Sequence, residues 1–116
     1  MVIIGVDDLM FSSRISTAAK ASGVEIRFAR SPQAIVDAVR ATSARLVILD
    51  LNSQRVSPLE AVAALKADAA LAETPTLGFV SHVQTDLIAQ ARQAGVGRVM
   101  ARSAFVAELP ELLKGA

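Results

Sequence analysis

The chain has 116 residues with 12 basic and 11 acidic side chains, which predicts a single domain over 1–116 with no strong attraction to nucleic acid or membranes. Cysteine, tryptophan and tyrosine are absent, which excludes disulfides and cysteine-based zinc sites and leaves few aromatic platforms for single-stranded nucleic acid. No apolar run approaches the roughly 20 residues of a membrane span, so we expect a cytoplasmic protein.

Apolar strands and amphipathic helices alternate from the N-terminus onward. An apolar run over 2–6 predicts the first strand, and a helix follows over about 10–22. The weakly alternating segment 24–29 predicts a strand near an edge of a sheet. The next strand, 45–49, includes four consecutive apolar residues and leads into Asp50. A strand that is apolar on both faces belongs in the middle of a parallel sheet covered by helices.

The second half of the chain continues the same alternation. The patterns predict a strand over 77–80, a helix over about 85–94 and a short strand over 98–101. A proline inside a helix removes a hydrogen bond and crowds the preceding turn. Because of Pro110, we expect the last regular helix to begin late, near Val106.

Two serine–proline pairs mark the starts of the second and third predicted helices. Ser31 and Pro32 have the types preferred at the N-cap and at the first helical position. Ser57 and Pro58 repeat this pair, and Glu60 lies three residues after Ser57. This spacing predicts a capping box, in which the serine and glutamate side chains bind each other's backbone amides.

Five alternating strands and helices predict an α/β fold, a doubly wound five-stranded parallel sheet with helices on both faces. The flavodoxin-like strand order 2-1-3-4-5 places the first and third strands side by side. Asp7, Asp8 and Asp50 would then share the crevice at the carboxyl ends of these strands. Ser81 and Arg102 would end the next two strands on the same rim.

These side chains suggest a metal-assisted phosphoryl site. Carboxylates gathered in one crevice repel one another unless they take up a proton or bind a cation. Oxygen ligands without histidine or cysteine favour a hard cation such as Mg²⁺. The carboxylate of Asp50 could act as a nucleophile and form an aspartyl-phosphate, with Ser81 and Arg102 beside the bound phosphoryl group.

The chain resembles the receiver domains of bacterial response regulators over nearly its full length. The matching segments are 6–8 after the first strand, 49–52 after the third, 80–81 after the fourth and 94–96 before the fifth.

The resemblance implies a signalling domain of a two-component system that accepts a phosphoryl group on Asp50 from a histidine kinase or phosphotransfer protein. Such a domain is no enzyme beyond promoting its own phosphorylation and dephosphorylation. The resemblance further implies that Asp8, Asp50 and the backbone carbonyl of Asn52 bind Mg²⁺ or Mn²⁺, with Asp7 acting through water. It also implies that Ser81 hydrogen-bonds a phosphoryl oxygen.

The family signals to a downstream protein through the face formed by the fourth helix, fifth strand and fifth helix, and here the chain departs from the family's pattern. The aromatic switch residue of the fifth strand is replaced by Val99, which has neither the reach nor two distinct buried positions. The other departures are Arg102 in place of lysine, Ser103 and Gln54 in place of prolines, Ser57-Pro58 in place of Asp-Gly, and His82 in place of a small residue.

Three interpretations of function therefore stay open. The acidic residues favour a phosphoacceptor domain that acts through a partner protein. The altered switch residues favour a degenerate receiver that works as a phosphorylation-independent interaction module. A flavodoxin-like binder of a small ligand is the third, although the acidic loop after the first strand suits an anionic cofactor poorly. Taken singly, Asp50 could be a strand-end cap, Ser81 an ordinary residue before a helix, Arg102 a solvated cation and His82 a loop residue.

Overall fold

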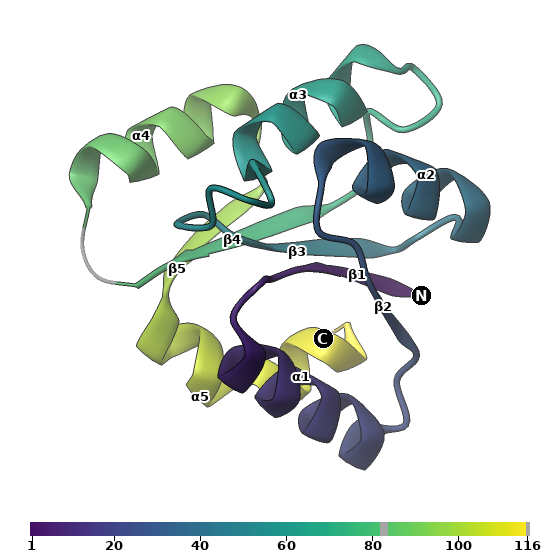
Figure 1. Ribbon diagram of the computed structural model, residues 1–116, viewed down its shortest axis with the longest axis vertical. Coiled ribbons are helices and arrows are strands. Elements are labelled where there is room, and N and C mark those ends of the chain that lie inside the picture. Colours follow the sequence, from purple (N-terminus) through teal and green to yellow (C-terminus); the bar gives the residue numbers. More distant parts are fainter. Residues whose placement is uncertain (82–83, 116) are drawn as a thin grey trace.

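The computed structural model describes residues 1–81 and 84–115, in which strands and helices alternate (Figure 1). The strands are β1 (Val2–Gly5), β2 (Ile26–Phe28), β3 (Leu46–Asp50), β4 (Thr76–Val80) and β5 (Arg98–Ala101). The helices are α1 (Leu9–Ser22), α2 (Pro32–Thr42), α3 (Pro58–Ala67), α4 (Thr85–Ala94) and α5 (Arg102–Lys114). The predicted ends of the strands and of the first and fourth helices agree with these bounds to within two residues.

The five strands form one parallel sheet in the order β2-β1-β3-β4-β5, which confirms the predicted fold class and strand order. The central strands have the predicted buried, apolar character, and the three-residue β2 lies at an edge. In the register of the sheet, Gly5 pairs with Leu49 and Asp50 pairs with Phe79. The loops that follow β1, β3 and β4 therefore leave the sheet at the same edge.

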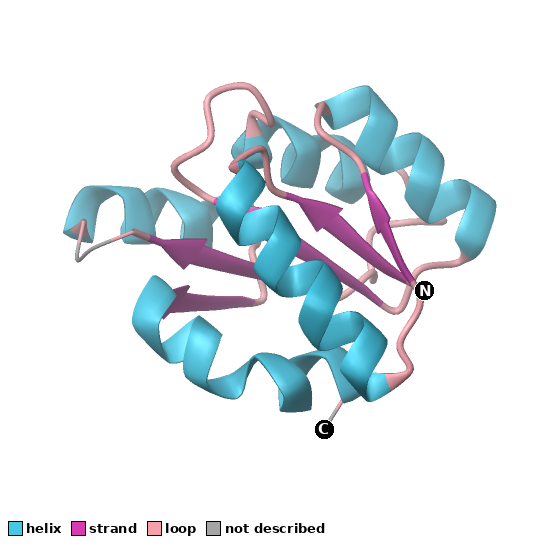
Figure 2. Ribbon diagram, turned by 60° about the horizontal axis from the view of Figure 1, so that its bottom comes forward, coloured by secondary structure: helices cyan, strands magenta, loops and turns pink. Residues whose placement is uncertain are grey.

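Helices cover both faces of the sheet and enclose two apolar clusters. Helices α2, α3 and α4 lie on one face, and α1 and α5 lie on the other, which Figure 2 turns to the front. On the α1–α5 face, the rings of Phe11, Phe79 and Phe105 stack with centroids 4.5–5.8 Å apart. Among the described residues, no helix is long and apolar enough to cross a membrane.

The start of α3 differs from the predicted capping box. Ser57 has a left-handed backbone, with φ 49°, and its side chain makes no capping hydrogen bond to α3. Instead, the Ser57 hydroxyl donates to the carbonyl of Gln54, at 2.9 Å. The hydroxyl is thus used within the preceding loop, and the capping-box prediction was wrong. Pro58 does occupy the first turn of the helix, as predicted.

The last helix begins earlier than the sequence suggested. It runs without interruption from Arg102 to Lys114 and contains Pro110, so the prediction of a late start near Val106 was wrong. Pro110 is exposed, and its ring therefore lies on the solvent side of the helix. Side chains on both sides of the proline anchor α5 to the core and outweigh the lost hydrogen bond; they are Phe105, Leu109, Leu112 and Leu113.

Candidate functional site

Asp50 is a buried carboxyl group at the end of the central strand β3. The residue is 6% exposed, and its Oδ1 accepts a hydrogen bond from the backbone amide of Asn52 at 3.0 Å. Burial raises the pKa of Asp50 above its ordinary value, and the Asp8 carboxylate adds to the rise, while the Asn52 amide and Arg102 oppose it. The structure therefore brings Asp8 and Arg102 within electrostatic reach of Asp50.

Asp8 is placed by the start of α1. It is the N-cap residue of that helix, and its Oδ1 accepts a hydrogen bond from the backbone amide of Phe11 at 2.9 Å. This capping role follows from its position directly before the helix, because an aspartate side chain satisfies one of the otherwise unpaired first amides. The same carboxylate is exposed at the carboxyl edge of the sheet.

Asp7 forms an ion pair with a residue of another loop. Its Oδ1 lies 3.4 Å from Nη1 of Arg55 in the loop after β3. Within residues 1–81 and 84–115, no three histidine, cysteine, aspartate or glutamate side chains form a group that could hold a metal ion. The described residues thus show no single group of three carboxylates, and Asp7 pairs with an arginine.

The remaining oxygen atoms fit a hard divalent cation in type. Asp8 and Asp50 contribute carboxylates, and the backbone carbonyl of Asn52 belongs to the loop that begins at Asp50. Mg²⁺ and Mn²⁺ are commonly held by one or two carboxylates together with carbonyl oxygens and water. These three residues are therefore the ones that would hold such an ion.

Ser81 and Arg102 lie on the same side of the molecule as Asp8. All three line an open cavity of about 840 Å³ beside the first turn of α1. The guanidinium carbon of Arg102 lies 5.0 Å from the centre of the Phe11 ring, and its Nε is buried and makes no hydrogen bond. The Arg102 side chain is thus half-buried against the Phe11 ring.

The side chain of Asn52 has a structural role that the sequence did not indicate. Its Oδ1 accepts a hydrogen bond from the backbone amide of Ser81 at 2.8 Å, and its Nδ2 donates to Oε1 of Gln84 at 2.6 Å. Arg55 and Gln84 were likewise not among the predicted site residues. Their contacts join parts of the chain that are far apart in sequence, so no local sequence pattern predicts them.

Of the departures from the receiver pattern not yet described, Val99 and Ser103 can be placed and His82 cannot. Val99 is half-buried and packs against the apolar cluster under α2, α3 and α4, and Ser103 is exposed. His82, which stands in place of the family's small residue, lies outside the described residues.

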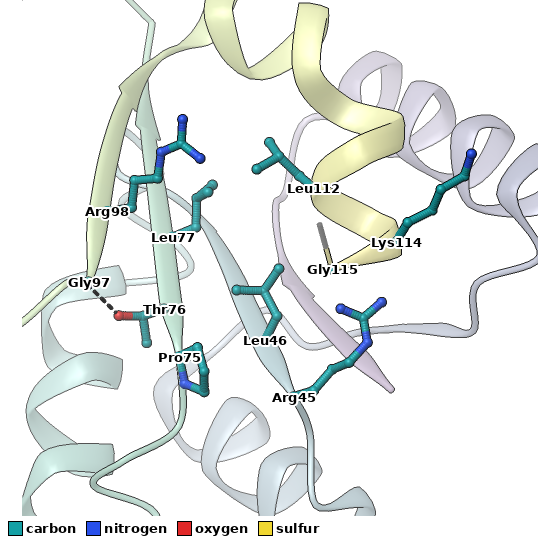
Figure 3. Close-up of a pocket in the computed structure, with 10 residues that line it drawn as sticks. All are labelled: Arg45, Leu46, Pro75, Thr76, Leu77, Gly97, Arg98, Leu112, Lys114 and Gly115. Carbon is teal, nitrogen blue, oxygen red and sulfur yellow. Dashed lines mark hydrogen bonds between the residues drawn. The ribbon is translucent and has the colours of Figure 1, made fainter.

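A second cavity, of about 590 Å³, lies at the opposite end of the sheet and contains none of the predicted site residues (Figure 3). Leu46, Leu77 and Leu112 line it together with basic side chains. Two of these cations already have partners within the protein. Arg45 donates to the carbonyl of Leu113, and Arg98 pairs with Glu108 at 3.3 Å. Arg45 and Arg98 are therefore explained by contacts with α5.

No protein-family model and no curated protein sequence matches the chain. Solved structures do match. A response regulator from Hahella chejuensis superimposes with a TM-score of 0.84 at 18% identity, over 97% of this chain and 91% of the other. The chain has the fold of a response-regulator receiver domain.

Two further structures with this receiver fold are informative. The phosphorylated cyanobacterial phytochrome response regulator RcpA matches with a TM-score of 0.78 and 23% identity, covering 98% of this chain and 88% of the other. The Mn²⁺-bound form of response regulator Rcp1 matches with a TM-score of 0.78 and 14% identity, covering 99% and 96%. At these identities the likeness establishes the receiver fold, and the chemistry has to be argued from the residues of this chain.

Proposed function

We propose that the chain is a phosphoacceptor receiver domain of a two-component system, which takes a phosphoryl group on Asp50 and signals through a partner protein. The observation that carries this proposal is the position of Asp50. It ends the central strand, within electrostatic reach of Asp8 on one side and Arg102 on the other. The phosphorylated and Mn²⁺-bound states of two proteins with this fold support the same chemistry.

The proposed reaction is a transfer of the phosphoryl group between two nucleophiles. A carboxylate oxygen of Asp50 forms a bond to phosphorus while the bond between phosphorus and a histidine nitrogen of the donor breaks, and the electron pair stays on that nitrogen. Ser81 hydrogen-bonds one phosphoryl oxygen, and Arg102 balances the negative charge of the group. Arg102 also favours the ionised form of Asp50 that the reaction needs, in opposition to burial.

A divalent cation fits this proposal through Asp8, Asp50 and the backbone carbonyl of Asn52. When bound, Mg²⁺ or Mn²⁺ would neutralise charge on the transferring oxygens. Asp7 would act through a water molecule, in competition with its ion pair to Arg55. The proposed donor is a histidine kinase or phosphotransfer protein in the cytoplasm, and the proposed output face for a downstream protein is α4, β5 and α5.

The test is direct phosphorylation by a small donor. The protein is incubated with phosphoramidate and Mg²⁺, and its intact mass is followed with time. We expect the mass to rise by one phosphoryl group in the native protein and in Asp37→Asn, an exposed aspartate on α2. We expect no rise in Asp50→Asn or in the presence of EDTA. Modification of Asp50→Asn at the native rate would show that the acceptor is misassigned.

Two observations favour the degenerate receiver as a second candidate. Asp7 is paired with Arg55, and Arg102 lies over the Phe11 ring, so two predicted members of the site make other contacts. A chain that is folded by circular dichroism but takes no phosphoryl group from any donor would support this second function over the first.

A further inference from the structure

The side chain of Asn52 joins two loops that leave the carboxyl edge of the sheet. Its Oδ1 accepts from the Ser81 amide at 2.8 Å, and its Nδ2 donates to Gln84 Oε1 at 2.6 Å. A backbone N–H can only donate, so it fixes which end of the Asn52 amide is the oxygen. The backbone amide of Asn52 meanwhile donates to Asp50 Oδ1. One residue therefore binds both Asp50 and the loop that leads into α4.

Helix α4 has no side-chain cap and buries little of its surface. Gln84 is its N-cap residue, and the Gln84 side chain makes no capping hydrogen bond to the helix. Of the residues in α4, only Ala91 is buried, while Leu87 and Ile88 are half-buried. A helix with few buried apolar contacts opens and shifts at low cost in free energy. The Asn52–Gln84 hydrogen bond thus joins the start of α4 to the loop after β3.

We propose that Asn52 is a positioning residue through which the state of Asp50 sets the position of the first turn of α4. This inference rests on the proposed function. Phosphoryl oxygens on Asp50 would compete with Asp50 Oδ1 for the Asn52 amide, and a cation would bind the Asn52 carbonyl. Either change moves Asn52, and its side chain carries the movement to Gln84. The response ends near Ile88, because Val99 offers no aromatic side chain to extend it into β5.

The first experiment tests the attachment without any ligand. Amide hydrogen exchange of α4 is measured by NMR for the native protein, Asn52→Ala, Gln84→Ala and the double variant. We expect exchange at Ile88 to become about two- to tenfold faster in Gln84→Ala, the range for losing one neutral hydrogen bond. Exchange should be at least as fast in Asn52→Ala, which also loses the bond to the Ser81 amide. The double variant should be no faster than Asn52→Ala alone, because both changes remove the same bond.

A control in the same loop is Gln54→Ala, whose side chain is exposed and whose backbone contact to Ser57 is kept. We expect native exchange in α4 for this variant. Unchanged α4 exchange in Asn52→Ala, or effects of the two single changes that add in full, would overturn the attachment. This outcome does not depend on whether Asp50 is ever phosphorylated.

The second experiment tests transmission from Asp50. Amide shifts are recorded with Mg²⁺ and beryllofluoride, a phosphoryl mimic, for the native protein, Gln84→Ala and Gln90→Ala, an exposed residue of the same helix. We expect shifts at Asp8, Asp50 and Ile88 in the native protein and in Gln90→Ala. In Gln84→Ala, the Asp8 and Asp50 shifts should persist and the Ile88 shift should fall at least threefold.

The two possible failures give different results. If Asp8 and Asp50 show no shifts in the native protein, the proposed phosphoacceptor function fails. If Asp8 and Asp50 respond and the Ile88 shift is as large in Gln84→Ala as in the native protein, the site functions but Asn52 and Gln84 do not carry its signal.

Discussion

The pair of helices α1 and α5 and the single helix α4 are attached to the sheet very differently. Helix α5 buries four side chains and, with α1, encloses the three stacked phenylalanines, whereas α4 buries only Ala91. Asp8 and Arg102 are carried by the starts of the two firmly packed helices, and Ser81 and Gln84 lead into the weakly packed one. Asp50 lies at the border between these regions. A chemical change at Asp50 would therefore act on two well-packed helices, α1 and α5, and on one helix, α4, that can shift more easily.

The largest effect should come from Phe79, which is fully buried and stacks against the rings of both Phe11 and Phe105. We expect Phe79→Ala to lower the free energy of unfolding by about 3–5 kcal/mol. The half-buried Leu87 of α4 is the matched test of the other region, and Leu87→Ala should cost about 1 kcal/mol. Urea unfolding measures both. Equal losses of unfolding free energy in the two variants would contradict the proposed difference in packing between the two regions.

In the well-packed helix α5, we expect a substitution of Pro110 to increase stability. The exposed proline interrupts the hydrogen bonds of α5, so Pro110→Ala should raise the free energy of unfolding by up to about 3 kcal/mol. The exposed neighbour Glu111 serves as the control, and Glu111→Ala should change stability by no more than about 0.5 kcal/mol. If Pro110→Ala is not more stable than the native protein, the local shape set by the proline contributes to packing.

The stability of the fold should depend on pH through Asp50, which lies at the border between the two regions. Burial raises the pKa of Asp50 in the folded protein above its unfolded value, so its ionised form destabilises the fold at neutral pH. The stability associated with its protonated form is complete below the unfolded pKa and is lost as the pH rises through the folded pKa. We therefore expect Asp50→Asn to have the higher Tm at pH 7 and the advantage to vanish in acid. Asp37→Asn should show no such trend; a lower Tm for Asp50→Asn at pH 7 would contradict the prediction.

The smallest effect concerns Arg55, which lies opposite Asp7 at the edge of the site. An exposed ion pair is worth less than about 1 kcal/mol, so removing this competing cation should tighten Mg²⁺ binding only about twofold. Isothermal titration of Arg55→Ala measures this change. Lys20→Ala removes the same charge from the far end of α1 and should leave the affinity at the native value. Equal affinities for all three proteins would show that Arg55 does not influence the site.

The sheet could be predicted well from the sequence because each strand is marked by a run of apolar residues that are neighbours in the chain. The apolar runs define the central strands, and the carboxylates that follow two of them locate Asp8 and Asp50 on one edge. The errors concern side chains whose partners are set by three-dimensional contacts. Ser57 has the right spacing for a capping box but a backbone that turns its hydroxyl toward Gln54.

The contact between Asn52 and Gln84 spans 32 residues of sequence and leaves no periodic pattern. For the same reason the pairing of Asp7 with Arg55 could not be predicted. Pro110 illustrates the opposite case, in which a strong local signal is outweighed by apolar side chains on both sides of it. The roles of Asp50, Ser81 and Arg102 in phosphoryl transfer stay predictions until the proposed experiments are done.

The two outer strands of the sheet have a consequence for self-association. The outer strands β2 and β5 have three and four residues, and each carries an exposed arginine, Arg27 and Arg98. Short, charged edges are poor templates for adding a strand from a second molecule. Growth of the sheet from copy to copy, the first step toward ordered aggregates, is therefore disfavoured at both ends. A specific dimer of this chain would therefore be favoured at surfaces other than these two edges.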